Sequence, residues 1–326
     1  MDLIYTDSNF TEKGYLNGVS MDMEIGEYSV SQNDFELTVP IDSLDPVFND
    51  GSLFYCEGTE YGGMIDHKKV STSNNTITFK GKTFRGMLEK EYVQPTDGSA
   101  YLVMNGEANT CINALITGRF DDLFVVDDIG DSGISVNYSI RDLNLLEALE
   151  NMLMKSSAKI DIRHMKDGKV HLKAVPINDM SEQIQYDRSY QISMNIETKI
   201  KPYNHVIALG KGELTDRIRV NLYMQNDGSW STVKTADGIN RKSYKYEDTN
   251  EEDQEKLIRN AIAKVNELNG TDSLDISFDA DNAELFDIVS AKEDITGISF
   301  KQKITQKIIK INGNAIDISY KVGESK

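Results

Sequence analysis

The sequence lacks long apolar segments and paired cysteines, and these absences exclude several classes of protein. No apolar run in the 326 residues approaches the roughly 20 that span a bilayer. The first 14 residues contain no basic segment followed by an apolar one, so no secretory leader is expected. Cys56 and Cys111 are isolated and have no CxxC spacing, which favours reduced, buried side chains over a disulfide framework. We therefore expect a soluble globular chain of roughly two or three domains, without a membrane anchor.

Basic residues are in short supply. The chain has 35 Lys and Arg against 53 Asp and Glu, a formal net charge of −18. Proteins that bind duplex DNA or RNA neutralise phosphates with basic side chains, so direct nucleic-acid binding is not expected. Without a geometry that concentrates the charge, solubility is the simplest reason for the acidity.

Motifs for nucleotide binding and nucleophilic catalysis are also missing. Gly81-Lys82-Thr83 resembles the end of a phosphate-binding loop, but Thr76 stands where that loop requires a glycine. Gly210-Lys211-Gly212 lies between two predicted strands, which indicates a turn and not a dinucleotide-binding helix. No serine occupies a GxSxG elbow, and neither cysteine has an identifiable base. A pair of catalytic carboxylates stays open, because any two of the 53 acidic residues could meet in space.

The sequence contains no metal-binding pattern either. Asp279, Asp281 and Glu284 could suggest a calcium loop, but Ala283 occupies a ligand position and the required glycine is missing. The four histidines have no metal-ligand spacing: His67, His164, His171 and His205. We predict no enzyme activity and no catalytic, cofactor-binding or metal-binding residues.

The clearest structural signal lies in Ser139 to Val175. Leucines and Ala148 recur every three or four residues from Leu143 to Leu153, which predicts a helix, with Asp142 as its N-cap. The period then changes to two on both sides of a Lys166-Asp167-Gly168 turn, which predicts a hairpin. A second amphipathic helix is predicted over Asn105 to Arg119. These elements form a predicted central α/β module, residues 96–182.

Strand patterns flank this module on both sides. Phe35, Leu37 and Val39 alternate with polar residues, and further short β segments follow at intervals of about ten residues, which is typical of a barrel or sandwich. Predicted β segments on the other side of the module are 184–200, 206–210, 217–223, 274–278, 288–289, 297–311 and 316–320.

One helix interrupts the second β region. It is predicted over 251–268, with Thr249 as its cap and Asn269-Gly270 at its end. Asn312-Gly313 predicts a tight hairpin. Lys301, Lys303 and Lys307 share one face of the preceding ribbon, and a solvated strand edge that prevents aggregation is the favoured interpretation.

These patterns predict an α+β, mainly β chain with three parts. Residues 1–95 form an N-terminal β-barrel-like module, residues 96–182 the central α/β module, and residues 183–326 a second β-barrel-like module with one inserted helix. We further expect the two β modules to share a similar topology, because matching strand runs stand on both sides of the centre.

This order of modules resembles the tail-tip or baseplate hub proteins of tailed bacteriophages, in particular the hubs of siphophages that infect Gram-positive bacteria, which are related to the trimeric hubs of contractile tails. The resemblance spans nearly the whole chain. One departure is Phe286, where the family pattern has a glycine before the aspartate. The stretches that carry the resemblance are 33–40, 77–88, 204–212, 219–223, 285–289 and 295–298.

The resemblance implies a structural protein of the virion tail tip, assembled in the bacterial cytoplasm. A homotrimer would form a ring that closes the tail tube at the host end and gives passage to DNA. The implied partners are distal tail or tail tube proteins and a tape measure protein. Since the sequence ends at Lys326, fibre or lysin functions are expected on separate proteins.

Two other function classes stay open: a tail-associated cell-wall hydrolase, and a receptor- or carbohydrate-binding tail protein. The first lacks a motif, and the second would expose aromatic platforms, whereas Trp230 is the only tryptophan. In a hub, carboxylates on the channel wall would repel passing phosphates, so the wall should carry acidic and small polar residues. The lysines at 301, 303 and 307 would then face outward or into a subunit contact.

Overall fold

The computed structural model describes residues 2–323, apart from residue 29 and the ranges 121–122, 182–184, 187–192, 198–201, 226–227, 270–272, 278–282, 293–298 and 314. Contacts divide the chain into two compact units. The large unit comprises Met1–Met194 and Asp275–Lys326, and the small unit comprises Asn195–Leu274. None of the described helices has the length and apolar character needed to cross a bilayer.

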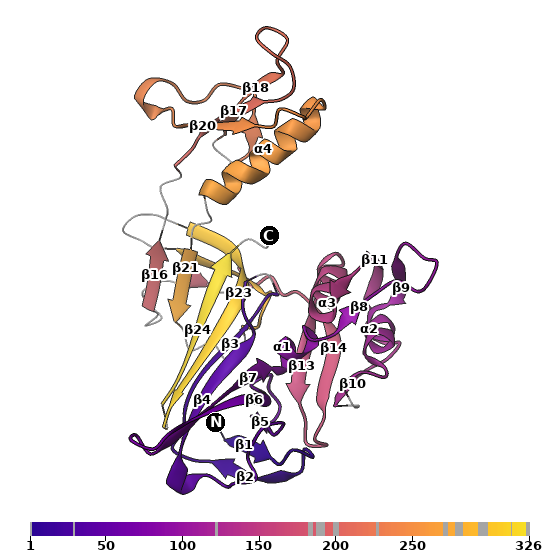
Figure 1. Ribbon diagram of the computed structural model, residues 1–326, viewed down its shortest axis with the longest axis vertical. Coiled ribbons are helices and arrows are strands. Elements are labelled where there is room, and N and C mark those ends of the chain that lie inside the picture. Colours follow the sequence, from indigo (N-terminus) through magenta and orange to yellow (C-terminus); the bar gives the residue numbers. More distant parts are fainter. Residues whose placement is uncertain are drawn as a thin grey trace. The chain divides into compact units, whose positions relative to one another are not determined.

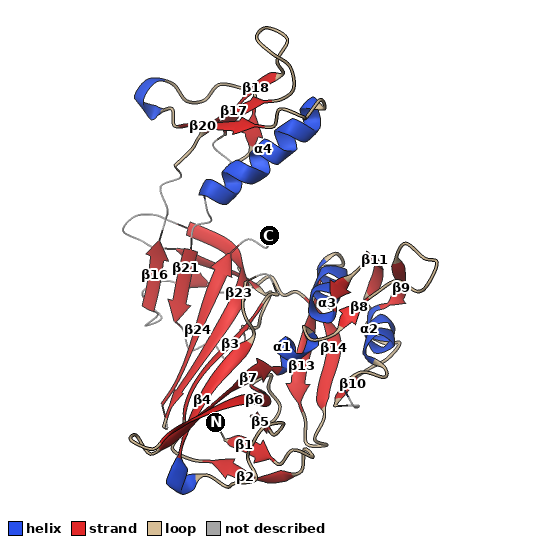
Figure 2. Cartoon of the chain, viewed as in Figure 1, coloured by secondary structure: helices blue, strands red, loops and turns tan. Residues whose placement is uncertain are grey.

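Most strands belong to one large sheet (Figures 1 and 2). Its N-terminal strands are β1 (Leu3–Thr6), β2 (Glu12–Leu16), β3 (Ser20–Gly26), β4 (Asp34–Pro40), β5 (Leu53–Tyr55), β6 (Gly62–Ser71) and β7 (Thr76–Thr83). A short 3-10 helix, η1 (Ile41–Ser43), follows β4. Its later strands are β15 (Gln185–Tyr186), β16 (Ser193–Glu197), β21 (Ser273–Ser277), β22 (Ile288–Lys292), β23 (Ser299–Asn312) and β24 (Ala315–Gly323).

Strands from the two ends of the chain are neighbours in this sheet. The order runs β21-β24-β23-β3-β4-β7-β6-β5-β1-β2, and β23 pairs antiparallel with β3 over seven residues (Figure 1). The predicted segments 1–95 and 183–326 therefore do not coincide with the compact units. Among the described residues the sheet stays open and does not close into a barrel. The similar topology of the two predicted β modules stays a prediction.

Residues 84–176, between the two sets of strands of the large sheet in the sequence, form helices and short strands that lie beside this sheet in Figure 2. The helices are α1 (Phe84–Leu88), α2 (Ala108–Ile116) and α3 (Leu145–Met154). The strands are β8 (Tyr92–Val93), β9 (Leu102–Glu107), β10 (Phe124–Val126), β11 (Ser135–Ile140), β12 (Leu143–Asn144), β13 (Ala158–His164) and β14 (Val170–Pro176). The predicted hairpin is confirmed, because β13 and β14 pair antiparallel around a turn with Gly168 at φ 79°.

The predicted helices are confirmed, but their starts differ from the prediction. Helix α3 begins after Asn144, whose side chain accepts a hydrogen bond from the Glu147 amide at 2.9 Å. The proposed cap Asp142 lies two residues earlier with φ 52°. Helix α2 starts at Ala108 because the residues before it pair as β9 with β11. In both helices, the apolar stripe is buried in one core shared with β1, β5 and α1.

The small unit is a sheet covered on one face by a helix. Its elements are β17 (His205–Leu209), β18 (Arg219–Met224), β19 (Trp230–Ser231), η4 (Gly238–Asn240), β20 (Ser243–Glu247) and α4 (Gln254–Asn269), with strand order β19-β18-β17-β20. The predicted helix is confirmed: Leu257, Ala261 and Val265 pack on Val206 and Leu222. Its first amides are capped by the Asp253 carboxylate at 2.8 and 3.2 Å and not by Thr249.

The predicted fold class, α+β and mainly β, is confirmed. The predicted alternation of buried and exposed residues along strands is confirmed as well. On β4, the side chains of Phe35, Leu37 and Val39 are almost fully buried. The two cysteines are free, with Cys111 buried and Cys56 partly buried. Most of the predicted β segment 184–200 lies outside the described residues.

Candidate functional site

The outward face of β3, β4, β6 and β7 carries a concentration of charged side chains. Strand alternation creates it, because residues such as Met23 and Leu37 face the core and leave their neighbours in solvent. Seven charged residues line a groove of about 490 Å³ there. We call them the charged sheet face: Asp22, Glu24, Asp34, Glu36, Asp66, Lys80 and Lys82.

The strand register places opposite charges side by side on this face. Asp22 lies opposite Lys310 on β23, and Glu36 lies opposite Lys80 on β7, so that each of the two acids, which are themselves neighbours across β3 and β4, has a lysine on its other side. The Lys310 and Asp22 side chains approach to 3.5 Å, and those of Lys80 and Glu36 to 2.5 Å. The hydrogen bond with Glu36 raises the pKa of Lys80. Because all four side chains are about half exposed, such pairs add little stability, and their main effect is to set the surface charge.

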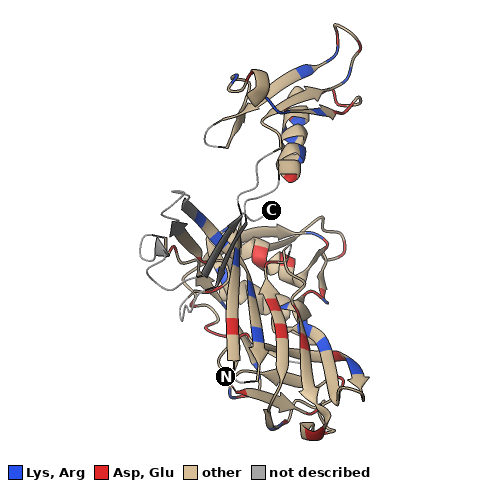
Figure 3. Cartoon of the chain, turned by 90° about the vertical axis from the view of Figure 1, so that its left-hand side faces the viewer, with Lys and Arg blue, Asp and Glu red and all other residues tan. Residues whose placement is uncertain are grey.

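The charged sheet face is acidic overall but not uniformly so. Five carboxylates against two lysines leave it a net charge of −3, and Figure 3 shows both signs on neighbouring strands. The small unit contributes little to the acidity of the chain, since Asn195–Leu274 holds 12 basic and 13 acidic residues. The net charge of −18 therefore resides almost entirely in the large unit.

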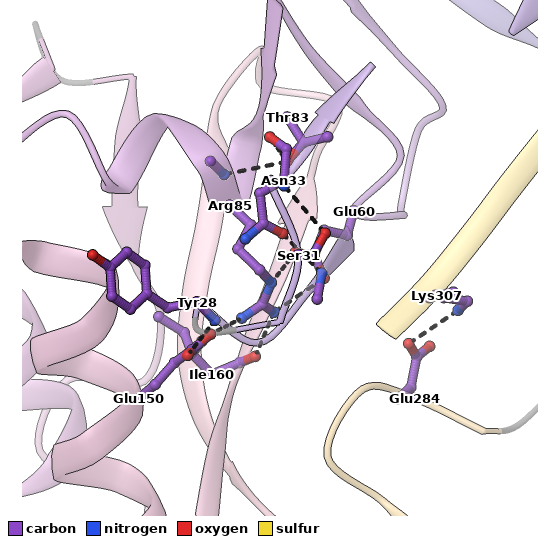
Figure 4. A network of polar contacts seen from close by, with 12 residues as sticks. Tyr28, Ser31, Asn33, Glu60, Thr83, Arg85, Glu150, Ile160, Glu284 and Lys307 are labelled. Atoms are coloured by element: carbon purple, nitrogen blue, oxygen red, sulfur yellow. Dashed lines mark hydrogen bonds and ion pairs between the residues drawn. The ribbon is translucent and has the colours of Figure 1, made fainter. Parts of the chain in front are cut away.

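A second polar cluster is buried inside the large unit (Figure 4). Arg85 of α1, only 1% exposed, donates to both oxygens of Glu60 at 2.7 and 3.2 Å. It also donates to Glu150 of α3 at 3.2 Å and to the Ile160 carbonyl at 3.4 Å. Burial raises the pKa of Glu150 to about 7, although Arg85 opposes this shift. One guanidinium thus holds together two carboxylates that come from distant parts of the sequence.

The lysine stripe on β23 belongs mainly to the interior, which corrects the prediction of a solvated edge. Lys303 pairs with Glu27 at 3.0 Å, and Lys307 pairs with Glu284 at 3.3 Å, with lysine side chains 14% and 7% exposed. Only Lys301, paired with Asp179, is largely exposed. The reason is that β23 lies in the middle of the sheet, between β24 and β3.

Phe286 adopts the backbone conformation that a glycine would favour. Its φ is 71°, which is unusual for a bulky residue, and its ring is buried. The Lys303 ammonium lies 5.0 Å and the Arg85 guanidinium carbon 5.8 Å from the ring centroid. The next residue, Asp287, is fully buried and pairs with Lys159 at 2.6 Å. The chain therefore makes a tight turn here, closed by the Asp287 amide donating to the Glu284 carbonyl at 3.1 Å, although Phe286 stands where the resemblance predicts a glycine.

The sequence motifs rejected as ligand sites have structural roles. Thr83 of the Gly81-Lys82-Thr83 triplet caps α1 by accepting from the Gly86 amide at 3.2 Å. Gly210-Lys211-Gly212 connects β17 to β18. Asp279 and Asp281 of the rejected calcium loop lie outside the described residues.

Each of the four histidines has its own set of neighbours. His164 is buried and stacks on Tyr55 at 3.5 Å, and its pKa falls to about 4 through burial. His171 lies between Asp127 and Asp167 at 2.6 and 2.9 Å. His205 contacts Ser243 and Asn221, and His67 lies opposite Lys80. No group of three potential metal ligands occurs within the described part of the chain.

The buried cluster was missed at the level of sequence, although one signal pointed to it. Glu150 stands four residues after Leu146 and three before Leu153, on the stripe that the helical period assigns to the core. A carboxylate there needs a buried partner. Its partner Arg85 is 65 residues away in the sequence and had no signal of its own.

No known family model and no curated protein sequence matches this chain. Its fold is nevertheless similar over almost its full length to three solved tail proteins. A tail protein of prophage MuSo2 from Shewanella oneidensis matches with a TM-score of 0.56 and 10% identity, covering 99% of this chain and 98% of that one. A Neisseria meningitidis tail protein gives 0.51 and 12%, covering 99% and 96%. A Listeria monocytogenes prophage tail protein gives 0.50 and 13%, covering 100% and 95%.

Proposed function

We propose that this chain is a structural component of a phage or prophage tail. The observation that carries the proposal is the likeness of fold to three tail proteins from three bacteria, in which nearly the whole of both chains is matched. A match of this extent includes both compact units and their order in the chain.

The finer part of the proposal is a trimeric hub at the tail tip. Three copies would form a ring that continues the tail tube, contacts tube and tape measure proteins, and lets DNA pass. The charged sheet face is the proposed channel wall, because it is the broad polar surface of the largest sheet and carries a net charge of −3 per chain. Its carboxylates would repel phosphates within about one Debye length, ~8 Å at physiological salt.

The positions of the lysines support this arrangement. Lys303 and Lys307 turn into the large unit, so they cannot offer phosphates a binding site on the channel wall. Lys80 and Lys310 lie on the exposed side, but each is paired with a carboxylate there. On the charged sheet face itself a passing DNA would meet two lysines that are both paired with carboxylates, Lys80 with Glu36 and Lys82 with Glu89.

Assembly is the first test. Tails purified from cells that express a tagged chain should carry the tag at the tip when viewed by electron microscopy, with three copies in each particle by mass measurement. Absence from tails overturns the structural role, whereas one, two or six copies overturns only the trimer. Release of fragments from purified cell-wall polymers would favour the hydrolase alternative.

The channel wall is tested by charge reversal. Asp34→Lys with Glu24→Lys changes the charged sheet face from net −3 to net +1 without touching the pairs of Asp22 and Glu36. We expect particles that assemble but release DNA more slowly, with the defect relieved by added salt. Reversal of an exposed acid elsewhere, Glu255→Lys on α4, is the matched control. Equal DNA release by all three particles would contradict the channel assignment.

A further inference from the structure

The turn that connects β3 to β4 is fastened to the rest of the large unit by charged contacts. The Tyr28 amide donates to Oε2 of Glu150 at 3.0 Å, while the other oxygen, Oε1, accepts from Arg85. Glu27 at the start of the turn pairs with Lys303, and its amide donates to the Thr305 carbonyl at 2.9 Å. Glu150 therefore connects helix α3 to a turn more than one hundred residues earlier in the sequence.

The surroundings of Glu150 contain one negative charge too many. Three elements present charged groups to it: Arg85 on α1, Glu60 on the other side of Arg85, and Glu27 of the turn. The cluster as a whole holds five carboxylates and four basic groups: Glu27, Glu60, Glu150, Glu284 and Asp287, with Arg85, Lys159, Lys303 and Lys307. Six of these residues form balanced pairs, so the excess negative charge lies in the buried triad of Glu60, Arg85 and Glu150, which one bound proton would make neutral.

We propose that Glu150 is a proton-controlled latch, which holds Tyr28, in the turn after β3, against helix α3 when ionised and releases it when protonated. Both oxygens of the ionised carboxylate accept hydrogen bonds, one from Arg85 and one from the Tyr28 amide. A bound proton converts one acceptor oxygen into a donor. The guanidinium and the amide are both donors, so the contact at the protonated oxygen, which is now a hydroxyl and a poor acceptor, is weakened.

The contact that yields is the one with the turn. Arg85 is fully buried and also held by Glu60 and the Ile160 carbonyl, whereas Tyr28 is 38% exposed and its amide can turn to water. The raised pKa of Glu150, about 7, places this exchange near neutral pH. The turn carries two exposed apolar side chains, Tyr28 and Val30, so its release changes the apolar surface of the large unit.

Hydrogen exchange of the full chain between pH 5.5 and 8.5, followed by mass spectrometry, tests the latch. The reference at each pH is Glu150→Gln, which removes the ionisable group, so the intrinsic dependence of exchange on pH cancels. We expect the peptide that contains Tyr28 to be about tenfold better protected in the wild type at pH 8.5, and equal in the two proteins at pH 5.5. Glu255→Gln on α4 makes the same change at an exposed site and should behave like the wild type at every pH.

A constant ratio between wild type and Glu150→Gln across the range would overturn the latch, and so would an equal response to Glu255→Gln. If Glu150→Gln does not fold, the wild type alone decides. Protection of the Tyr28 peptide, divided by that of a β4 peptide, should then rise between pH 5.5 and 8.5, and a flat ratio refutes the proposal. The tail assembly assay does not enter this result, so the latch and the proposed function can fail separately.

Discussion

Removing the Arg85 side chain should be among the most damaging substitutions in the large unit. Arg85→Met would keep most of the apolar volume but leave Glu60 and Glu150 facing each other without a cation. Breaking a buried ion pair by deleting one partner costs about 3–5 kcal/mol. Here two carboxylates lose their partner, although Glu150 can take up a proton and so limit the cost. We expect a loss of about 3–4 kcal/mol from the free energy of unfolding at pH 8, and a smaller loss at pH 6.

The chain provides an internal control for this measurement. Its single tryptophan, Trp230, lies in the small unit, whereas Arg85 lies in the large one. In a urea unfolding experiment, circular dichroism at about 218 nm, where β-sheets absorb, reports mostly the large sheet. Tryptophan fluorescence reports the small unit. Arg85→Met should move the transition seen by circular dichroism to lower urea and leave the transition seen by tryptophan fluorescence in place.

A matched variant separates the lost charge from the lost packing. Arg85→Met combined with Glu60→Met and Glu150→Leu replaces the whole buried triad by apolar side chains, which is often neutral in stability. This triple variant should recover most of the loss. If the single variant costs less than about 1 kcal/mol, or if the triple variant is less stable than the single one, the assignment of a buried ionic triad is refuted.

Three further predictions concern single side chains. Glu107→Ala should cost about 1–2 kcal/mol of stability, because the carboxylate caps α2 by accepting from the Asn109 and Thr110 amides. Burial opposes ionisation, but hydrogen bonds hold the Glu107 pKa well below its usual range, so the stabilisation is present above about pH 4.5 and is lost on acidification. Melting curves of wild type and variant at pH 7 and pH 3 would show this loss. Phe286→Gly should be more stable than Phe286→Ala by about 1 kcal/mol in urea unfolding, since the positive φ penalises any Cβ; equal stability would contradict the strain. Burial opposes the charged form of His171, yet its hydrogen bonds to carboxylates raise its pKa, so its contribution is full below pH ~6.5 and disappears as pH rises through the raised pKa; the stability difference between wild type and His171→Asn should shrink from pH 6 to pH 9.

The sequence by itself determined the elements whose signals are local. The alternation on β4 and in the β13 to β14 hairpin decides which side chains face the core, since successive residues of a strand point to opposite faces. The stripes of α2, α3 and α4 follow in the same way from the helical period. The cap of α3 was predicted at Asp142, but Leu143 and Asn144 pair with β8 as strand β12, so the helix begins after Asn144, which caps it instead.

Only the tertiary structure decided the pairing of distant strands and what that pairing buries. Sequence alternation places Lys303 and Lys307 on a ribbon, but it cannot say that β3 joins this ribbon from almost 300 residues away and turns an expected edge into the middle of a sheet. The charged sheet face arises in the same way, because its rows of charge exist only in the register of β23, β3, β4 and β7.

The buried cluster shows the physical reason most directly. A carboxylate on an apolar helix stripe indicates that a cationic side chain must lie next to it, because an unpaired buried charge is too costly. The identity of that cation depends on which loops and strands meet there, and Arg85 reaches Glu150 only because α1 and α3 pack against each other. The local sequence therefore determined that Glu150 needs a buried partner. Long-range packing, which no local pattern encodes, determined that this partner is Arg85.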